Sequence, residues 1–542
     1  MPCDARMTPA RPSRTRYLLY AIVLVAGVLR LARLDLMAFE MDEAVACIQA
    51  IRFTHYGLWP LLGVKTSFQF YNSPLFIYVI SPAFLVTTDA RFAALLFALL
   101  GMAGVYVVYR TGREFFSPAV GLVAAAMLAV SPAAVEYSRR LWGHSLIQVL
   151  CPVVFYLMLR WVVAGRAKAI FWLALIAGAA QQFHFSGALL WGQLVLAYLL
   201  FRPRTDWIGF VCGLVLGLVG YLPYFIAEAD LGLDDLGIIG QLIWRGTGEP
   251  WSLGLGPLVY WLLAVTDLGH NNFLQDEFAP FLARIPLYRV TRAAVGAAWI
   301  GALVGCAVCV VRDLRGGRLW RSLGEGKAAR PLILLLWSLV PLVAFLGLRA
   351  QVVAPYFLVV YPAPFLAIAW AVVALWQRLE SSVRAIGLRR LAQAAIVILL
   401  AAWAGHQLVF QVALRWRLDR DGGGVGSYAS FGAQQKAMQF IAMYAPDRTA
   451  VVSEEYLDPR DLTKGISFRY WFLLWTFDHN MERFFPRDRE KADYWYVIRN
   501  TNLHIRSDFD AFLEISRLHE REFGFLWVCV IPRPGPWPRF GP

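Results

Sequence analysis

The sequence predicts an all-α polytopic membrane domain followed by a smaller soluble α/β domain. Of the 542 residues, 59% are hydrophobic and 16% are charged, whereas soluble chains contain about 25% charged residues. Apolar stretches long enough to cross a bilayer recur up to about residue 412. After about residue 415, charged residues alternate with apolar ones, which is typical of a soluble domain.

Eleven stretches are predicted to span the membrane, because about 20 apolar residues are needed to cross its hydrocarbon core. They are residues 17–34, 91–110, 118–137, 143–163, 169–185, 186–201, 207–226, 291–311, 331–348, 355–377 and 391–412. Two further apolar segments, 74–88 and 256–266, are too short to assign by length, and the first contains Pro74 and Pro82.

The basic residues of the loops decide the expected orientation. If residues 74–88 do not cross the membrane, every later cluster of Arg and Lys falls on the side of the N-terminus. Cytoplasmic loops carry an excess of these residues. We therefore expect 74–88, and likewise 256–266, to be interfacial or re-entrant helices. The C-terminus is then outside the cytoplasm.

The composition and the placement of charges argue against two other classes of protein. The net charge of +14 is also typical of nucleic-acid-binding proteins, but the basic residues lie in short clusters between apolar runs, as in loops beside an anionic leaflet. We expect no nucleic-acid partner. The predicted spans contain almost no Asp, Glu or His, and ion-coupled transporters use such residues at mid-membrane. A transporter or lipid flippase is therefore the second hypothesis, and a non-catalytic scaffold is the third.

The tail is divided from the membrane part at about residue 415. Residues 1–414 are expected to form the membrane domain and residues 415–542 a soluble α/β domain on the outer side. The tail is expected to contain a helix over 432–444 and strands over Thr449–Ser453, Asp493–Ile498 and Phe525–Ile531. It has no phosphate-binding loop and no metal-ligand spacing. We expect it to cover the membrane site or to help bind the acceptor.

Asp42 and Glu43 are the principal candidates for chemistry. They follow the first predicted span by fewer than ten residues, and a helical stretch from Ala44 to Tyr56 comes next. The long outer segment 35–90 then returns to the membrane at Asn72-Ser73-Pro74-Leu75. The alternative is an ordinary solvated acidic pair on a loop.

The order of these segments resembles a known family. The runs "MDEAVACIQAIRFTHYGLWP", "YNSPLFIYVISPAF" and "ARFAALLFALLGMAGVYVVYRTGREFFSPAVGLVAAAMLAVSPAAVEYSRR" are similar to the N-terminal module of GT-C superfamily glycosyltransferases. The branch they resemble contains the protein O-mannosyltransferases and the aminoarabinose–lipid A transferases. The resemblance is clear over residues 15–230 and weaker at "VAPYFLVVYPAPFLAIAW".

The resemblance implies a GT-C fold in a bacterial inner membrane, with the tail periplasmic or extracellular. It implies a polyprenyl-phosphate-linked sugar as donor, a hydroxyl of a lipid, glycan or protein as acceptor, and inversion at the sugar. It also implies that Asp42 is the general base, because a hydroxyl nucleophile needs a carboxylate within about 3 Å to take its proton. Glu43 is expected to orient the acceptor or to raise the pKa of Asp42.

Several cationic and polar residues are candidates for binding the donor phosphate, because a phosphate leaving group is stabilised by fixed cations. Arg139 and Arg140 lie in the second outer loop, where interfacial anchoring to lipid headgroups is the alternative. By resemblance, Arg349 and Tyr356 belong near the donor phosphate. Lys65 in the first outer loop and His144 complete the set: Lys65, Arg139, Arg140, His144, Arg349 and Tyr356.

One departure from the family concerns a second carboxylate. Family members often have a functional Asp in the second outer loop, whereas this chain has Leu141-Trp142-Gly143-His144. The nearest carboxylate there is Glu136. No metal ligand set is therefore predicted, and a divalent cation stays open. For His144, a hydrogen-bonded interfacial histidine is preferred to a catalyst.

Overall fold

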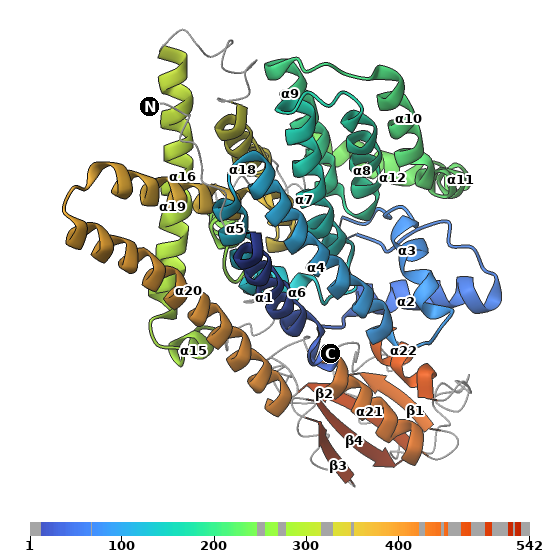
Figure 1. Cartoon of the computed structure of the whole chain (residues 1–542). Coiled ribbons are helices and arrows are strands. Elements are labelled where there is room, and N and C mark those ends of the chain that lie inside the picture. The colour runs from blue at the N-terminus through green and yellow to red at the C-terminus, as the bar shows by residue number, and fades with distance from the viewer. Residues whose placement is uncertain are drawn as a thin grey trace.

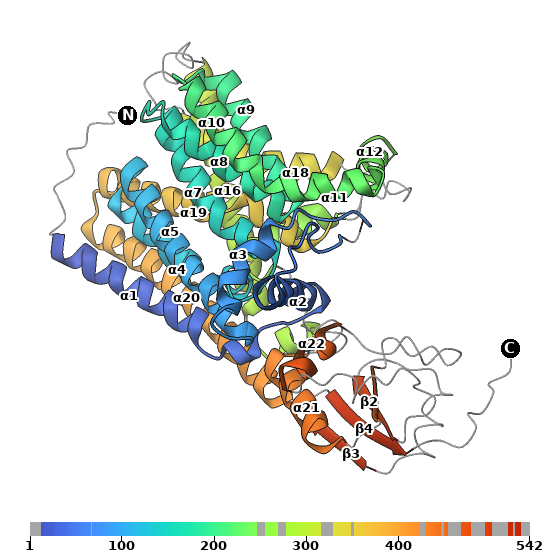
Figure 2. The same cartoon turned by 90° about the vertical axis from the view of Figure 1, so that its right-hand side faces the viewer.

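The computed structural model describes residues 12–66, 68–245, 255–268, 278–315, 329–347, 352–421, 429–445, 449–453, 468–477, 494–500, 519–523 and 526–532. Apolar helices form the body of the molecule, and a small sheet lies beyond one end of them (Figure 1). Figure 2 shows α1, α4 and α20 running toward that end, with α2 between the helices and the sheet.

The first helices lead from the membrane part into the outer segment. They are α1 (Pro12–Leu31), η1 (Leu34–Leu36), α2 (Met41–Tyr56) and α3 (Leu75–Phe84). The first turn of α2 is closed by Glu43, whose Oε2 accepts a hydrogen bond from the backbone N–H of Glu40 at 3.1 Å. The helix ends at Gly57, which has a left-handed φ of 67°.

The remaining helices build the body of the molecule. They are α4 (Ala90–Phe115), α5 (Pro118–Val130), α6 (Pro132–Tyr137), α7 (Gly143–Val162), α8 (Ala169–Phe183), η2 (Phe185–Ala188), α9 (Leu189–Phe201), α10 (Trp207–Leu218), η3 (Val219–Tyr221), α11 (Leu222–Asp230), α12 (Asp234–Arg245), α13 (Gly256–Leu263), α15 (Phe278–Ala283), α16 (Tyr288–Arg315), α18 (Ala329–Gly347), η5 (Ala354–Val360), α19 (Ala363–Ser382) and α20 (Ile386–Asp421).

Glycines allow two of these helix pairs to approach closely. A Cβ atom on Gly112 of α4 would lie 2.5 Å from the Cα of Gly121 in α5. A Cβ atom on Gly178 of α8 would lie 2.9 Å from the carbonyl carbon of Gly217 in α10. Small residues are the usual means by which membrane helices bring their backbones together.

The expected spans fall on helices of the structure. Among the described residues, six helices are long and apolar enough to cross a membrane: Ala90–Phe115, Gly143–Val162, Trp207–Asp230, Tyr288–Asp313, Ala329–Gly347 and Ile386–Arg420. The η5 and α19 helices, bent by 53°, make a seventh if they are counted as one span. The expectation of a polytopic helical membrane protein is confirmed, and the count of eleven stays a prediction.

The ambiguous segment 74–88 contains a short helix. Helix α3 has 10 residues, which makes it about 15 Å long at 1.5 Å per residue. The hydrocarbon core is about 30 Å thick. This length agrees with an interfacial or re-entrant helix.

The described part of the tail contains a four-stranded sheet and two helices. Helix α21 (Phe431–Tyr444) and strands β1 (Thr449–Ser453), β2 (Tyr494–Asn500) and β4 (Leu526–Pro532) lie within a residue or two of the predicted elements. Helix α22 (Phe468–Phe477) and strand β3 (His519–Phe523) were not predicted. The strand order is β1-β2-β4-β3, with β1 parallel to β2 and the other pairs antiparallel. Helix α20 continues to Asp421, past the expected domain boundary at residue 415.

The tail packs directly on the segment that precedes α2. Phe39 is fully buried, and its ring lies 5.2 Å from that of Phe431 and 5.5 Å from that of Phe472. The side-chain amide of Gln434 donates to the carbonyl of Phe39 at 2.9 Å. The N–H of Phe431 donates to the carbonyl of Met37 at 2.9 Å. These contacts place the sheet and α2 on the same side of the molecule.

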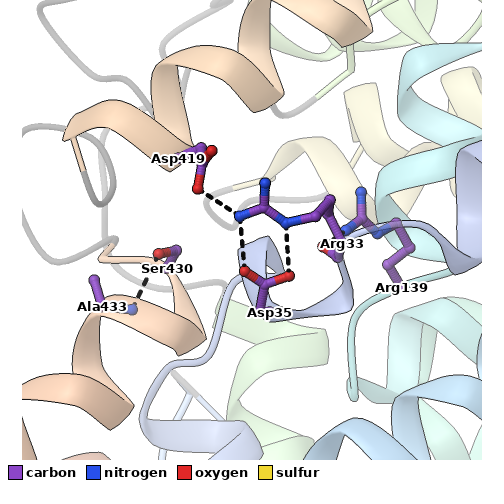
Figure 3. Close-up of polar contacts among 6 residues, drawn as sticks. All are labelled: Arg33, Asp35, Arg139, Asp419, Ser430 and Ala433. Atoms are coloured by element: carbon purple, nitrogen blue, oxygen red, sulfur yellow. Dashed lines mark hydrogen bonds and ion pairs between the residues drawn. The ribbon is translucent and has the colours of Figure 1, made fainter.

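An ion-pair cluster joins the segment before α2 to α20 (Figure 3). The guanidinium of Arg33 contacts Asp35 at 2.9 Å and Asp419 of α20 at 2.5 Å. Nearby, Ser430 caps α21 by accepting a hydrogen bond from the N–H of Ala433 at 3.4 Å. Because Arg33 and Asp419 are about half exposed, this ion pair contributes only about 0–1 kcal/mol.

Candidate active site

Asp42 lies in the first turn of α2, at the end of the helical body that faces the sheet (Figure 2). Its Oδ2 accepts a hydrogen bond from the indole Nε1–H of Trp142 at 3.1 Å. Burial, and then the negative charge of Glu43, raises the pKa of Asp42 to about 6, against the opposing effects of Arg140 and of the indole hydrogen bond. A carboxylate with this pKa is poised to accept a proton near neutral pH.

The carboxylate of Glu43, unlike that of Asp42, uses both of its oxygens in contacts within the protein. Its side chain is fully buried, and Oε1 forms an ion pair with the Nε of Arg140. Its other oxygen closes the first turn of α2. With both oxygens in use, Glu43 anchors Arg140 beside Asp42. The expectation that Glu43 orients the acceptor stays a prediction.

Aromatic rings extend from Asp42 into the helical body. The ring of Trp142 has its centroid 4.1 Å from the guanidinium carbon of Arg140 and 4.0 Å from the ring centroid of His144. His144 then contacts the ring of His184 at 3.7 Å, and His184 contacts Tyr356 at 4.8 Å. We call Arg140, Trp142, His144, His184 and Tyr356 the ring column.

His144 and His184 differ in their hydrogen bonds. The backbone N–H of Ser186 donates to Nδ1 of His184 at 3.1 Å. His144 is 6% exposed, and neither of its ring nitrogens has a hydrogen-bond partner among the described residues. A buried polar group without a partner is costly. Both the preference for a hydrogen-bonded interfacial histidine and the donor-phosphate role of His144 stay predictions.

A cavity of about 600 Å³ begins where the ring column ends. Tyr356 and Phe185 belong to its wall, and the ring of Phe185 lies 4.9 Å from that of Tyr356. The wall is largely apolar and aromatic, with polar contributions that include Asn72 and Ser73. A cavity of this volume with few polar groups suits an apolar ligand that carries one polar end.

The other predicted donor-binding residues lie in different surroundings. Arg139 donates to the backbone carbonyl of Arg33, so the two neighbouring arginines contact different segments. Lys65 is exposed, with its ammonium 5.4 Å from the ring centroid of Tyr71, which lines the cavity. Arg349 lies outside the described residues. Glu136 is buried on α6, and its Oε1 has no hydrogen-bond partner in the part of the chain that the structure describes.

The described part of the chain contains no group of three or more His, Cys, Asp or Glu side chains that could hold a metal ion. Asp42 and Glu43 are the acidic pair of the site. Beside them lie Trp142, from the predicted second outer loop, and His144, from the first turn of α7, rather than another carboxylate.

Trp142 contacts the candidate base Asp42, and it is not among the site residues that the sequence predicts. It was noted only as part of a segment that lacks an Asp. Nothing in one sequence shows that it meets Asp42, which is 100 positions earlier. The available signal was its place beside Arg140 in a predicted outer loop.

Comparisons with known proteins agree with this fold. Residues 71–227 match the model of the dolichyl-phosphate-mannose-protein mannosyltransferase family. This segment includes the ring-column residues Arg140, Trp142, His144 and His184 but not Asp42. The comparison with curated proteins finds no match.

Three solved structures are similar over most of the chain. ArnT from Cupriavidus metallidurans in the apo state gives a TM-score of 0.56 at 14% identity, covering 96% of this chain and 98% of that one. The same protein bound to undecaprenyl phosphate gives 0.55 at 14% identity, covering 98% and 100%. The apo oligosaccharyltransferase of Archaeoglobus fulgidus gives 0.51 at 16% identity, covering 86% of this chain and 64% of that one.

These findings confirm the class expected from the sequence. The structural likenesses establish the GT-C fold, and the family-model match adds the glycosyltransferase class over residues 71–227. The chain is a membrane glycosyltransferase with the GT-C fold.

Proposed function

We propose that this chain transfers a sugar from a polyprenyl-phosphate donor to a hydroxyl of a lipid, glycan or protein acceptor on the non-cytoplasmic face of a bacterial inner membrane. The observation that carries the proposal is the Asp42 carboxylate, held by Trp142 beside Arg140 at the end of the helical body that faces the sheet. The ring column leads from it to the apolar cavity.

The donor class is supported by the chemistry of the cavity. Its apolar, aromatic wall fits a polyprenyl chain, and ArnT, which shares the fold, has been solved with undecaprenyl phosphate. We assign the phosphate end of the donor to the region of Tyr356 and His144, because the ring nitrogens of His144 have no hydrogen-bond partner there among the described residues. Arg139, Arg140, Lys65 and Arg349 stay candidates for phosphate contacts.

The proposed reaction is a single displacement with inversion. The acceptor hydroxyl oxygen forms a bond to the anomeric carbon as the bond from that carbon to the phosphate oxygen breaks. The phosphate leaves with the bonding electron pair, and Asp42 takes the hydroxyl proton. Cationic groups near the phosphate stabilise its growing charge. A pKa of about 6 leaves Asp42 ionised at pH 7 and still basic enough to accept the proton.

The proposal is tested by replacing Asp42. Membranes containing the full chain are incubated with a panel of radiolabelled undecaprenyl-phosphate sugars, and label in non-donor products is measured. Asp42→Asn should reduce transfer by about a hundredfold or more, because general-base catalysis contributes about 10²–10⁴-fold.

Asp35→Asn is the matched control. Asp35 belongs to the same outer segment, but it pairs with Arg33 rather than with the site. This variant should retain near-wild-type transfer. Full activity of Asp42→Asn would contradict the assignment of the base, and no transfer by the wild-type chain from any donor in the panel would contradict the donor class.

A further inference from the structure

The hydrogen bond from Trp142 to Asp42 joins the predicted second outer loop directly to the proposed base. Oδ2 of Asp42 is 3.1 Å from the indole nitrogen. Among the described residues, Oδ1 has no hydrogen-bond donor, so it is the oxygen left for the acceptor hydroxyl. A carboxylate with one oxygen held and one oxygen open has a defined direction in which it accepts a proton.

The indole itself is held by two neighbours. Arg140 lies over one side of it at 4.1 Å, and Arg140 is in turn held by the buried Glu43. His144 contacts it at 4.0 Å and is backed by His184. A donor that cannot swing away can hold its partner within the few tenths of an ångström that a reactive geometry requires.

The backbone around Trp142 supports the same placement. The N–H of Ser145 donates to the carbonyl of Trp142 at 2.9 Å, which starts α7 immediately after the indole. Gly143 brings this turn against the end of α8, because a Cβ there would lie 2.3 Å from the carbonyl oxygen of Phe183. The position of Trp142 is thus set by two helices and not by loop packing alone.

We propose that Trp142 is a positioning residue of the transfer reaction, whose indole N–H holds Oδ2 of Asp42 so that Oδ1 faces the acceptor hydroxyl. This inference rests on the proposed role of Asp42 as general base. It assigns to an indole in the second outer loop the task of orienting the base. The charged groups that act on Asp42 are Glu43, its neighbour on α2, and Arg140 before α7.

Two substitutions separate the hydrogen bond from the ring packing. Trp142→Phe keeps an aromatic ring between Arg140 and His144 but removes the N–H donor. Trp142→His keeps a five-membered ring in which Nε2 takes the place of the indole Nε1, so the donor is retained. Both variants are assayed as full-length protein in membranes, with the undecaprenyl-phosphate sugar that the wild-type chain uses.

Trp142→Phe should lower kcat by about ten- to hundredfold with little change in the KM for the donor, because a misdirected base affects the chemical step. The acidic limb of its pH–rate profile should move up by about 0.5–1 pH unit, because a donated hydrogen bond favours the ionised carboxylate. Trp142→His should recover most of kcat above pH 7 and bring the limb back toward the wild-type position.

Other outcomes overturn the inference without ambiguity. Equal activity of Trp142→Phe and wild type would remove any positioning role. Equal losses in both variants, with an unmoved acidic limb, would assign Trp142 to packing alone. Thermal unfolding of each variant in detergent shows whether a loss comes from misfolding. Activity retained in Asp42→Asn would instead reject the proposed function, whatever the result at Trp142.

Discussion

At Asp42, the negative charge that a base needs also lowers the stability of the folded protein. Burial raises the pKa of Asp42 to about 6, well above the value of about 4 for a free carboxyl. The folded protein therefore binds the proton of Asp42 more tightly than the unfolded chain does. The stability linked to this group is fully present below about pH 4 and is lost as the pH rises through about 6. At pH 8 Asp42 is ionised, as a base must be in order to accept a proton, and this buried charge lowers the free energy of unfolding.

Asp42→Asn should therefore stabilise the protein while it abolishes transfer. Asparagine is neutral at every pH, and its Oδ1 can still accept the N–H of Trp142. The free energy of unfolding should rise at pH 8 by about 1–3 kcal/mol, from a pKa difference of about two units. The gain should shrink as the pH falls toward 4. Thermal unfolding in detergent at pH 8 and pH 5 measures it, and a variant less stable than wild type at pH 8 would contradict the expectation.

The sequence predicted which residues are candidates for the site, but not which side chains they contact. Adjacent carboxylates in an apolar chain were sufficient to single out Asp42 and Glu43. Their division of labour was not predictable, because it depends on Arg140 and Trp142 about 100 positions later. The neighbours Arg139 and Arg140 look equivalent in sequence, yet the turn between α6 and α7 sends them to different partners.

Among the elements, the long apolar helices were the most predictable. Their length and composition are dictated by the bilayer, so the expected spans coincide with helices of the structure. Strand β3 was not predicted because its sequence, His-Glu-Arg-Glu-Phe, lacks the apolar alternation of a strand. Its place at the edge of the sheet, paired with β4 alone, explains why charged residues suffice there.

The start of α7 gives a prediction at this scale. Gly143→Ala should lower the free energy of unfolding by about 1–3 kcal/mol, because its Cβ would overlap a backbone oxygen of α8 that cannot rotate away. The displacement of α7 from α8 should also separate His144 from His184 and reduce transfer. Thermal unfolding and the transfer assay measure both effects.

Gly192→Ala in α9 is the matched control for that substitution. An added Cβ at Gly192 meets no atom within 4 Å, and alanine favours a helix by up to about 1 kcal/mol relative to glycine. This variant should be as stable as wild type or slightly more stable, with unchanged transfer. If both alanine variants behave alike, the close approach of α7 to α8 does not set the geometry of the ring column.

At the scale of the whole molecule, the tail and the proposed base share one end of the structure. Phe39, three residues before Asp42, is buried between Phe431 and Phe472 of the tail. The sequence predicted this side from loop charges alone, by counting crossings. The packing of Phe39 also puts the tail and Asp42 on one side of the molecule, and it does so without counting membrane crossings, because the segment before α2 contacts the tail. It could not be foreseen, since the contact joins residues almost 400 positions apart.

The shared side leads to a topology prediction. A reporter enzyme that is active only outside the cytoplasm, fused after residue 420, should be active. The same reporter fused after Gly165, in the connection between α7 and α8, should be inactive, because Arg166 and Lys168 lie in that loop and Arg160 lies in the last turn of α7 beside it. An inactive fusion at 420 would put both the tail and Asp42 in the cytoplasm, since Phe39 packs on the tail. That result would remove the argument for a lipid-linked donor, because nucleotide sugars would then be available to the site. Activity at 420 together with inactivity after Gly165 would place Asp42 on the face where the proposed donor and acceptor meet.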